Sequence, residues 1–148
     1  MKFIIATIFA VLILLSGCQN QSVFKIVKEQ NQFVIINGKT IESVTVSMIG
    51  KDMNDVEDPY IVYEKNDVNE IKALVNAIKK AKKVQGIINV VKADYQFSFI
   101  FIDGTSEAYF LWLNVDSGSL MHGKDTHTLY TLPKDVVEEL RLKLMSFK

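Results

Sequence analysis

The segment Tyr95–Phe101, with the sequence YQFSFIF, decides the fold. Aromatic side chains occupy every second position, and a period of two is that of a β-strand whose two faces differ. One face carries Tyr95, Phe97, Phe99 and Phe101. We expect this aromatic face to lie in the core, where cross-strand ring contacts stabilise a sheet.

More strands are predicted on the C-terminal side of this segment. Asp103-Gly104 is a turn sequence, and it leads into a strand over 107–114. One face of that strand carries Tyr109, Leu111 and Leu113, and the other carries Phe110 and Trp112. A turn over 116–118 and a last strand over 126–132 follow. This order predicts antiparallel neighbours joined by short turns.

The N-terminal side predicts hairpins. Asn37-Gly38 has the sequence of a two-residue type I′ turn, which needs positive φ at both positions. This turn would join a strand over 32–36 to a strand over 41–49, in which Val44, Val46 and Met48 alternate with polar residues. Short strands are also expected over 23–28 and 60–63, and an exposed loop over 50–59.

Two amphipathic helices complete the prediction. Between 68 and 81 the apolar residues recur at the spacing of one buried helix face, with Asn66 or Asp67 as N-cap and Glu70 as a capping-box partner. We expect Lys79, Lys80, Lys82 and Lys83 in the last turns, before Gly86. A second helix is expected after Pro133, with the apolar face Val136, Val137, Leu140 and Leu144.

Together these elements predict the α+β class: a mainly antiparallel sheet with two amphipathic helices packed on it. The chain of 148 residues contains no linker-like or repeated segment, so we expect one domain over 23–148. Its 17 basic and 17 acidic side chains balance, which argues against a nucleic-acid partner. The single cysteine excludes an intramolecular disulfide.

The first residues have the pattern of an export signal. Lys2 precedes an apolar run over 3–15 that is too short to span a bilayer, and small residues follow it. Leu15-Ser16-Gly17-Cys18 resembles the lipobox of bacterial lipoprotein precursors. The resemblance implies removal of residues 1–17, acylation of Cys18 and a short tether over 18–22. The alternative is an ordinary secretory signal that happens to end in a cysteine.

If Cys18 carries two acyl chains, such as palmitate, the bilayer is the chain's first partner. One chain gives only marginal attachment, whereas two give stable anchoring. We therefore expect a lipid-anchored protein at the extracytoplasmic face of the cell membrane.

A second resemblance covers the chain from about Ile41 onward. The segments AIKKA (77–81), ADYQFSFIF (93–101), YFLWLN (109–114) and DTHTLYTLP (125–133) are similar to those of the YhfM-like lipoproteins of Gram-positive bacteria. This family supplies no catalytic residue to transfer, so the resemblance implies the fold and the lipid anchor.

Candidate chemistry remains open at several places. His122, Asp125 and His127 are ligand types for a zinc ion with an open position, although a polar turn between strands explains them better. The acidic loop over 52–58 contains oxygen ligands for calcium but lacks the spacing of an EF-hand. Asp94 with Asp116 or Glu107 would be a carboxylate pair for glycoside cleavage only at the right separation.

Two surface features also allow two explanations each. The lysines over 79–83 suit anionic lipid headgroups or envelope polymers, or they are a solvated end of a helix. Ile100, Phe110 and Trp112 either pack within the sheet or form an exposed docking surface.

No serine-hydrolase elbow, P-loop or dinucleotide-binding glycine pattern is present. We therefore expect no catalytic, metal-binding or cofactor-binding residues, and a non-enzymatic domain that binds a membrane or cell-envelope component. The rival hypothesis is a metal-assisted envelope hydrolase using His122, Asp125 and His127.

Overall fold

The computed structural model describes residues 33–86 and 89–145, which all belong to one compact unit. The signal-like segment, Cys18, the tether and the strand expected over 23–28 lie outside the described residues. Within the described part, no helix has the length and apolar character needed to cross a membrane.

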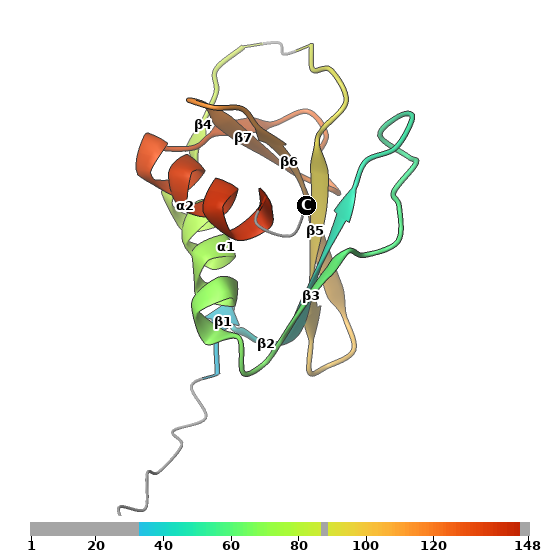
Figure 1. Ribbon diagram of the computed structural model, residues 1–148, viewed down its shortest axis with the longest axis vertical. Coiled ribbons are helices and arrows are strands. Elements are labelled where there is room, and N and C mark those ends of the chain that lie inside the picture. The colour runs from blue at the N-terminus through green and yellow to red at the C-terminus, as the bar shows by residue number, and fades with distance from the viewer. Residues whose placement is uncertain (1–32, 87–88, 146–148) are drawn as a thin grey trace, which may run out of the picture. The chain divides into compact units, whose positions relative to one another are not determined.

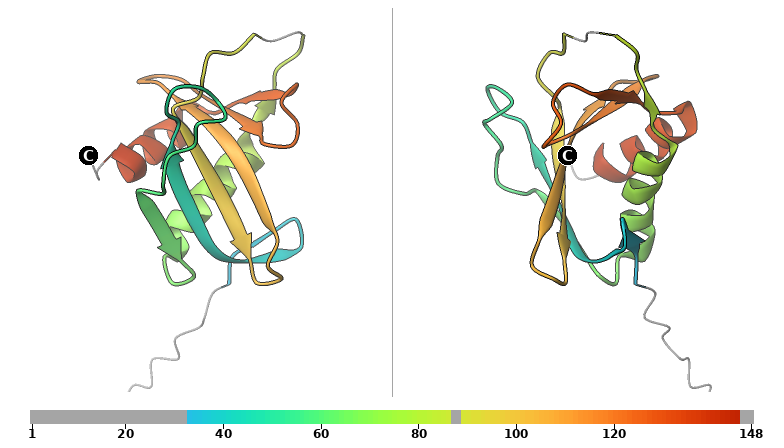
Figure 2. Two further views of the ribbon diagram at one scale, coloured as in Figure 1. Left: turned by 90° about the vertical axis from the view of Figure 1, so that its right-hand side faces the viewer. Right: turned by 180° about the vertical axis from the view of Figure 1, so that it is seen from behind.

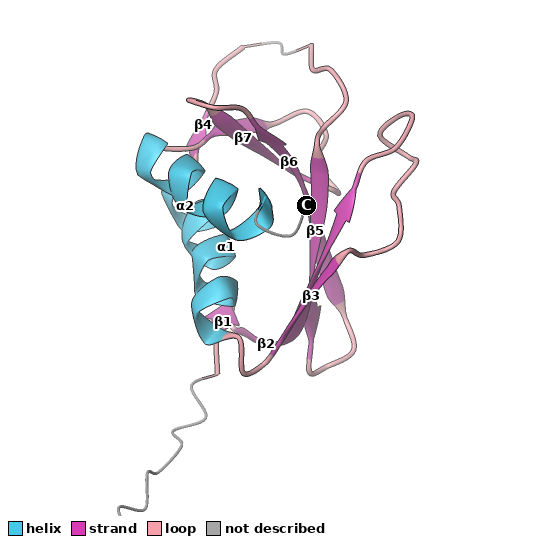
Figure 3. Cartoon of the chain, in the orientation of Figure 1, coloured by secondary structure: helices cyan, strands magenta, loops and turns pink. Residues whose placement is uncertain are grey.

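The described residues form an antiparallel sheet and two helices, which confirms the predicted α+β class (Figure 3). The strands are β1 (Ile35–Ile36), β2 (Lys39–Met48), β3 (Ile61–Glu64), β4 (Lys82–Lys83), β5 (Tyr95–Phe101), β6 (Ser106–Leu113), β7 (Gly118–His122) and β8 (Leu129–Thr131). The helices are α1 (Val68–Lys80) and α2 (Lys134–Met145). In the sheet the order is β1-β2-β5-β6-β7-β8-β4, and β3 also pairs with β2.

Both helices lie on the same side of the sheet (Figure 1). The sheet bends around them, so that β1 and β4, at the two ends of the strand order, both lie beside α1 (Figure 1 and Figure 2). This curvature places the end of α1 close to the strands that follow β5, and that end of the sheet contains the candidate site.

The predicted hairpin turn between β1 and β2 is confirmed. Asn37 has φ 50° and Gly38 has φ 77°, so both residues adopt the left-handed conformation that the turn requires. The register pairs Ile36 with Lys39, which leaves two residues in the turn.

The predicted alternation in β2 is confirmed for Val44 and Val46, which are both fully buried. Ile41 is out of phase with them, yet it is also buried. The pairing with β5 explains this, because Ile41 faces Phe101 while Ser43 already faces Ile100. A bulge at this point leaves Glu42 without a partner on β5 and returns Ile41 to the inner face.

The aromatic face of β5 lies in the core, as predicted. Phe97, Phe99 and Phe101 have no exposed surface. Tyr109 on β6 stacks on Phe97 at a centroid distance of 5.4 Å. The buried face of α2 consists of the predicted residues, Val136, Val137, Leu140 and Leu144.

The predicted end of the first helix was wrong. Helix α1 ends at Lys80, Ala81 is extended, and Lys82 and Lys83 form β4 rather than a last helical turn. Lys82 pairs with Thr131 of β8, and Lys83 pairs with Tyr130. The strand β8 thus supplies backbone partners that the helix end lacks, and tertiary pairing outweighs the local helical preference of lysine.

The predicted capping box was also wrong. Asp67 occupies the N-cap position, but its side chain makes no capping bond to the helix. Its Oδ2 instead accepts a hydrogen bond of 2.8 Å from the backbone N–H of Glu64. Glu70 lies 3.2 Å from Nζ of Lys143 and so links the first turn of α1 to α2.

The last strand, β8, is shorter than expected, and β7 was not predicted as a strand at all. Gly118, which was assigned to a turn, begins β7 and pairs with Leu113. A Cβ atom built on Gly118 would lie 2.9 Å from Cγ2 of Val137 and 3.2 Å from the carbonyl oxygen of Trp112. Glycine is needed there because α2 packs directly against the strand.

We therefore expect Gly118→Ala to lower the free energy of unfolding by about 1–3 kcal/mol, the usual cost of overpacking a core. Urea denaturation monitored by circular dichroism measures this change. Ser117→Ala, on the exposed turn next to it, is the matched control and should change stability little. Equal stability of the two variants would contradict the close approach of Val137 to Gly118.

Two tyrosine hydroxyls hold the end of α2. The hydroxyl of Tyr60 donates a hydrogen bond of 3.3 Å to the carbonyl of Leu144, and that of Tyr63 donates one of 3.5 Å to the carbonyl of Lys143. These carbonyls belong to the last turn, which has no intrahelical donors. Burial raises the pKa of both tyrosines above the ordinary value, so both hydroxyls keep their protons in the folded state.

The free energy of unfolding should consequently fall as the pH rises above about 10, because the unfolded chain then releases phenolic protons that the folded chain retains. Tyr60→Phe should be less stable at pH 8 by about 1 kcal/mol, the worth of one hydrogen bond. It should also lose less stability than the unmodified chain between pH 9 and 11. Urea unfolding across this range provides the measurement, and parallel pH curves for the two proteins would refute the expectation.

Candidate functional site

A pocket of about 310 Å³ lies between the end of α1 and the strands β6, β7 and β8. Its volume is at the lower end of the ~300–1,000 Å³ typical of small-molecule sites. Its lining combines apolar, aromatic and ionisable side chains: Ile78, Ala81, Tyr109, Leu120, His122, Asp125 and Tyr130.

Strand register brings these residues to one face of the sheet. Tyr109 on β6 faces His122 on β7, and Leu120 on β7 faces Tyr130 on β8. Directly paired residues of antiparallel strands project to the same side. The two pairs therefore form adjacent rows on the inner face, and the last turn of α1 and Ala81 close the pocket from the helix side.

Tyr109 is a fixed wall of the pocket. Its side chain is nearly buried, and its hydroxyl donates a hydrogen bond of 3.3 Å to Oε2 of Glu107. Burial, followed by the charge of Glu107, raises the pKa of Tyr109 to about 12. The ring of His122 meets the ring of Tyr109 edge-on, with centroids 4.9 Å apart. Tyr109 is therefore neutral, and its hydroxyl proton is engaged in the hydrogen bond to Glu107.

His122 and Asp125 are held by the loop between β7 and β8. Nδ1 of His122 accepts the backbone N–H of Lys124 at 3.0 Å, so the neutral ring carries its proton on Nε2. Oδ1 of Asp125 accepts the backbone N–H of His127 at 3.2 Å. Hydrogen bonds from the Thr128 hydroxyl and from this N–H keep the pKa of Asp125 below its ordinary value. Asp125 therefore contributes a permanent negative charge.

The three residues proposed as zinc ligands do not form a metal site. His122 and Asp125 line the same pocket, but His127 contacts Asp125 through its backbone and is not part of the lining. In the described ranges, no three histidine, cysteine or acidic side chains are grouped closely enough to hold a metal ion. The structure therefore does not group His122, Asp125 and His127 as ligands of one metal ion.

The acidic loop over 52–58 uses its carboxylates to form turns. Oδ1 of Asp52 accepts the backbone N–H of Asn54 at 2.9 Å, and Oδ2 of Asp55 accepts that of Lys51 at 2.7 Å. Within the described residues, which include this loop, no three acidic, histidine or cysteine side chains are grouped as metal ligands. Two of the carboxylates are instead used in turns of the loop itself.

The three candidate carboxylates for glycoside cleavage are dispersed. Asp94 accepts the backbone N–H of Leu113 at 2.8 Å, at the end of β6. Glu107 lies near the beginning of that strand, where it also accepts the side-chain amide of Asn37 at 3.4 Å. Asp116 lies 3.8 Å from Lys134, at the start of α2. Each carboxylate has a separate partner, and none of the three is part of the pocket lining.

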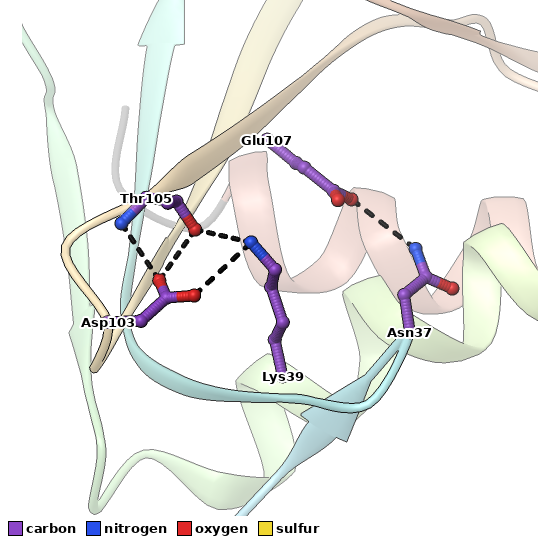
Figure 4. Close-up of polar contacts among 5 residues, drawn as sticks. All are labelled: Asn37, Lys39, Asp103, Thr105 and Glu107. Carbon is purple, nitrogen blue, oxygen red and sulfur yellow. Dashed lines mark hydrogen bonds and ion pairs between the residues drawn. The ribbon is translucent and has the colours of Figure 1, made fainter.

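A second polar cluster connects the β1–β2 turn with the β5–β6 turn (Figure 4). Nζ of Lys39 lies 3.3 Å from Oδ2 of Asp103 and donates a hydrogen bond of 2.6 Å to Oγ1 of Thr105. The same ammonium group lies 5.2 Å from the centroid of the Phe101 ring. Each polar group drawn in Figure 4 forms a hydrogen bond or ion pair with another residue of the cluster. We interpret it as a structural link between two hairpins.

The structure shows where the two surface features lie and what they contact. Ile100, Phe110 and Trp112 lie on the outer face and are only partly buried, and the Trp112 indole N–H donates to the carbonyl of Val91 at 2.9 Å. The lysines over 79–83 divide into two groups. Lys80 pairs with Asp135 of α2 at 2.8 Å, whereas Lys82 and Lys83 are exposed on β4.

The sequence identified His122 and Asp125, but it gave no reason to group them with Tyr109, Leu120 and Tyr130. The alternation within β6 pointed to Tyr109 as an inward residue. The missing information was the register of β7 and β8, which pairs Leu120 with Tyr130.

Replacing Glu107 by glutamine should lower the pKa of Tyr109, because it removes a neighbouring negative charge. The pKa should remain above the ordinary value of about 10, since burial is the larger cause of the shift. Tyrosine ring carbon chemical shifts followed by NMR between pH 9 and 12.5 measure this. An unchanged titration of Tyr109 would refute its contact with Glu107, and Glu138→Gln on the exposed surface of α2 is the matched control.

Comparison with known proteins gives one family and one solved structure. Residues 39–148 match the family model described as YhfM protein. No curated protein matches the chain. A crystal structure of a thioesterase-like protein from Clostridium sporogenes ATCC 15579 is similar, with 15% identity and a TM-score of 0.49, over 71% of this chain and 94% of that one. Because the family match spans most of the chain and includes the site, the chain belongs to the YhfM protein family.

Proposed function

We propose that this protein is a lipoprotein of the cell envelope, anchored at the extracytoplasmic face of the membrane by acylated Cys18, and that its domain binds a ligand without transforming it. The observation that carries the proposal is the sequence Leu15-Ser16-Gly17-Cys18 directly after the apolar run over 3–15. A charged start, an apolar stretch and small residues before a cysteine favour export followed by lipid attachment.

The energetics of anchoring agree with this proposal. Each methylene group of an acyl chain contributes about 0.8 kcal/mol when it enters the bilayer. One chain gives reversible attachment, and two chains on the same cysteine give stable attachment. The protein then needs no membrane-spanning helix and no basic surface to stay at the membrane.

The geometry of the pocket supports binding rather than catalysis. The Tyr109 hydroxyl donates a hydrogen bond to Glu107, and burial together with the charge of Glu107 raises the pKa of Tyr109, so that it keeps its proton. Nδ1 of His122 accepts a backbone N–H, and Asp125 accepts bonds within its own loop. An activated nucleophile needs an adjacent base, and here each candidate base already accepts a hydrogen bond from its own loop. The same groups are well held for recognition of a ligand.

The anchor is tested by replacing Cys18 with serine in a Gram-positive host grown with radiolabelled palmitate. We expect the unmodified chain to incorporate label and remain with membranes, and Cys18→Ser to incorporate none and to be released or remain uncleaved. Mass spectrometry of the N-terminal peptide gives the mass of the modification directly.

A double variant, Cys18→Ser with Ser22→Cys, is the matched control, because it keeps one thiol near the N-terminus but moves it away from the lipobox. It should also lack label. Acylation of this variant would show that any nearby thiol suffices, and unchanged membrane retention of Cys18→Ser would overturn the proposal.

A further inference from the structure

Charges of both signs stand beside the pocket between α1 and β6–β8, above an apolar floor. From this arrangement we propose that the pocket binds a small zwitterionic molecule, with an ammonium group, a carboxylate group and an apolar body, as in an α-amino acid. This inference rests on the proposed binding function and specifies its ligand class. Asp125 would receive the ammonium group and Lys83 the carboxylate.

The floor of the pocket suits an apolar body. Leu120 is almost completely buried, and Ile78 and Ala81 at the end of α1 are partly buried and line the same space. The half-buried ring of Tyr130 forms a further wall. Covering these surfaces with an apolar group removes them from water at a gain of about 25 cal/mol per Å².

Asp125 supplies the negative charge at the mouth. Its side chain lines the pocket and is exposed to solvent, and its hydrogen bonds to Thr128 and His127 fix its position. The charge of Lys83 is close enough to contribute to lowering the pKa of Asp125. Asp125 is part of the pocket lining, and Lys83 lies outside it, opposite the lining residue Tyr130 on the neighbouring strand.

Lys83 supplies the positive charge on the same face. It pairs with Tyr130, and Tyr130 pairs with Leu120, so the three side chains project to the inner side of the sheet. Lys82, its neighbour along the strand, projects to the opposite side. Both Lys83 and Asp125 are exposed, and the ion pairs formed within the described residues involve other side chains.

A ligand with only one charge fits this mouth less well. A simple amine would gain the attraction of Asp125 but would meet the repulsion of Lys83, and a simple carboxylate would meet the reverse. A zwitterion matches both charges at once, so that each charged group lies opposite its complement. In this arrangement Asp125 contacts the ammonium group of the ligand, and Lys83 contacts its carboxylate group.

Three probes that share a phenylethyl body test this proposal: L-phenylalanine, 2-phenylethylamine and 3-phenylpropionate. Isothermal titration calorimetry with the full chain in detergent gives their affinities. We expect L-phenylalanine to bind at least tenfold more tightly than either single-charge probe. Asp125→Asn should weaken L-phenylalanine and 2-phenylethylamine about tenfold and should strengthen 3-phenylpropionate, because it removes the charge that repels a carboxylate. Lys83→Gln should weaken L-phenylalanine and 3-phenylpropionate only.

Asp58→Asn and Lys65→Gln are matched controls, since both residues are exposed and lie outside the pocket lining. They should leave all three affinities unchanged. Equal affinity for the three probes, absence of binding, or equal effects of the pocket and control variants would each overturn the proposal. Binding in detergent does not require the acyl group, so a failure of the Cys18 anchor and a failure of this pocket are separate results.

Discussion

The structure depends on burial of the aromatic face of β5. Phe97, Phe99 and Phe101 have no exposed surface, and they belong to the same core cluster as the apolar faces of α1 and α2. Full burial of a phenylalanine side chain contributes about 1.5–3 kcal/mol. β5 lies between β2 and β6 in the sheet, so this face joins both halves of the sheet to the helices. Burial of this face therefore constrains the positions of both helices and of the neighbouring strands.

Curvature of the sheet follows from that packing and produces the pocket. Each strand after β5 pairs antiparallel with its predecessor, and the last of them, β8, meets β4 directly after α1. The end of the helix and the end of the sheet are thus covalently continuous through Ala81. A cavity remains where the two diverge, and its floor comes from the helix and the sheet together.

Much of the fold could be predicted from local patterns. The period of two in β5 and β6, the Asn37-Gly38 turn and the apolar face of α2 each depend on residues close together in the sequence, and each is confirmed. The errors lie where distant segments decide the outcome. Lys82 and Lys83 resemble the end of a helix until β8 is available to pair with them, and Gly118 resembles a turn until α2 packs against it.

The candidate site was only partly predictable for the same reason. His122 and Asp125 attracted attention as ionisable residues in a short segment, but their chemistry depends on Tyr109, Leu120 and Tyr130, which register alone places beside them. The metal hypothesis was based on residue types alone, without the strand register that determines which side chains lie close together. The lipobox-like sequence over 15–18 is a different class of signal, because processing enzymes would read it as sequence rather than as folded structure. It lies outside the residues that the structure describes.

The strands at the two ends of the strand order affect whether copies of the protein can pair through their sheet edges. β1 and β4 are each two residues long, and β4 consists of two lysines. Sheet margins that are short and positively charged are poor templates for a strand from another molecule. Confinement to a bilayer, as proposed here, would raise the frequency of encounters between copies. The margin at β4, which has both properties, would let neighbouring copies meet there and separate without pairing.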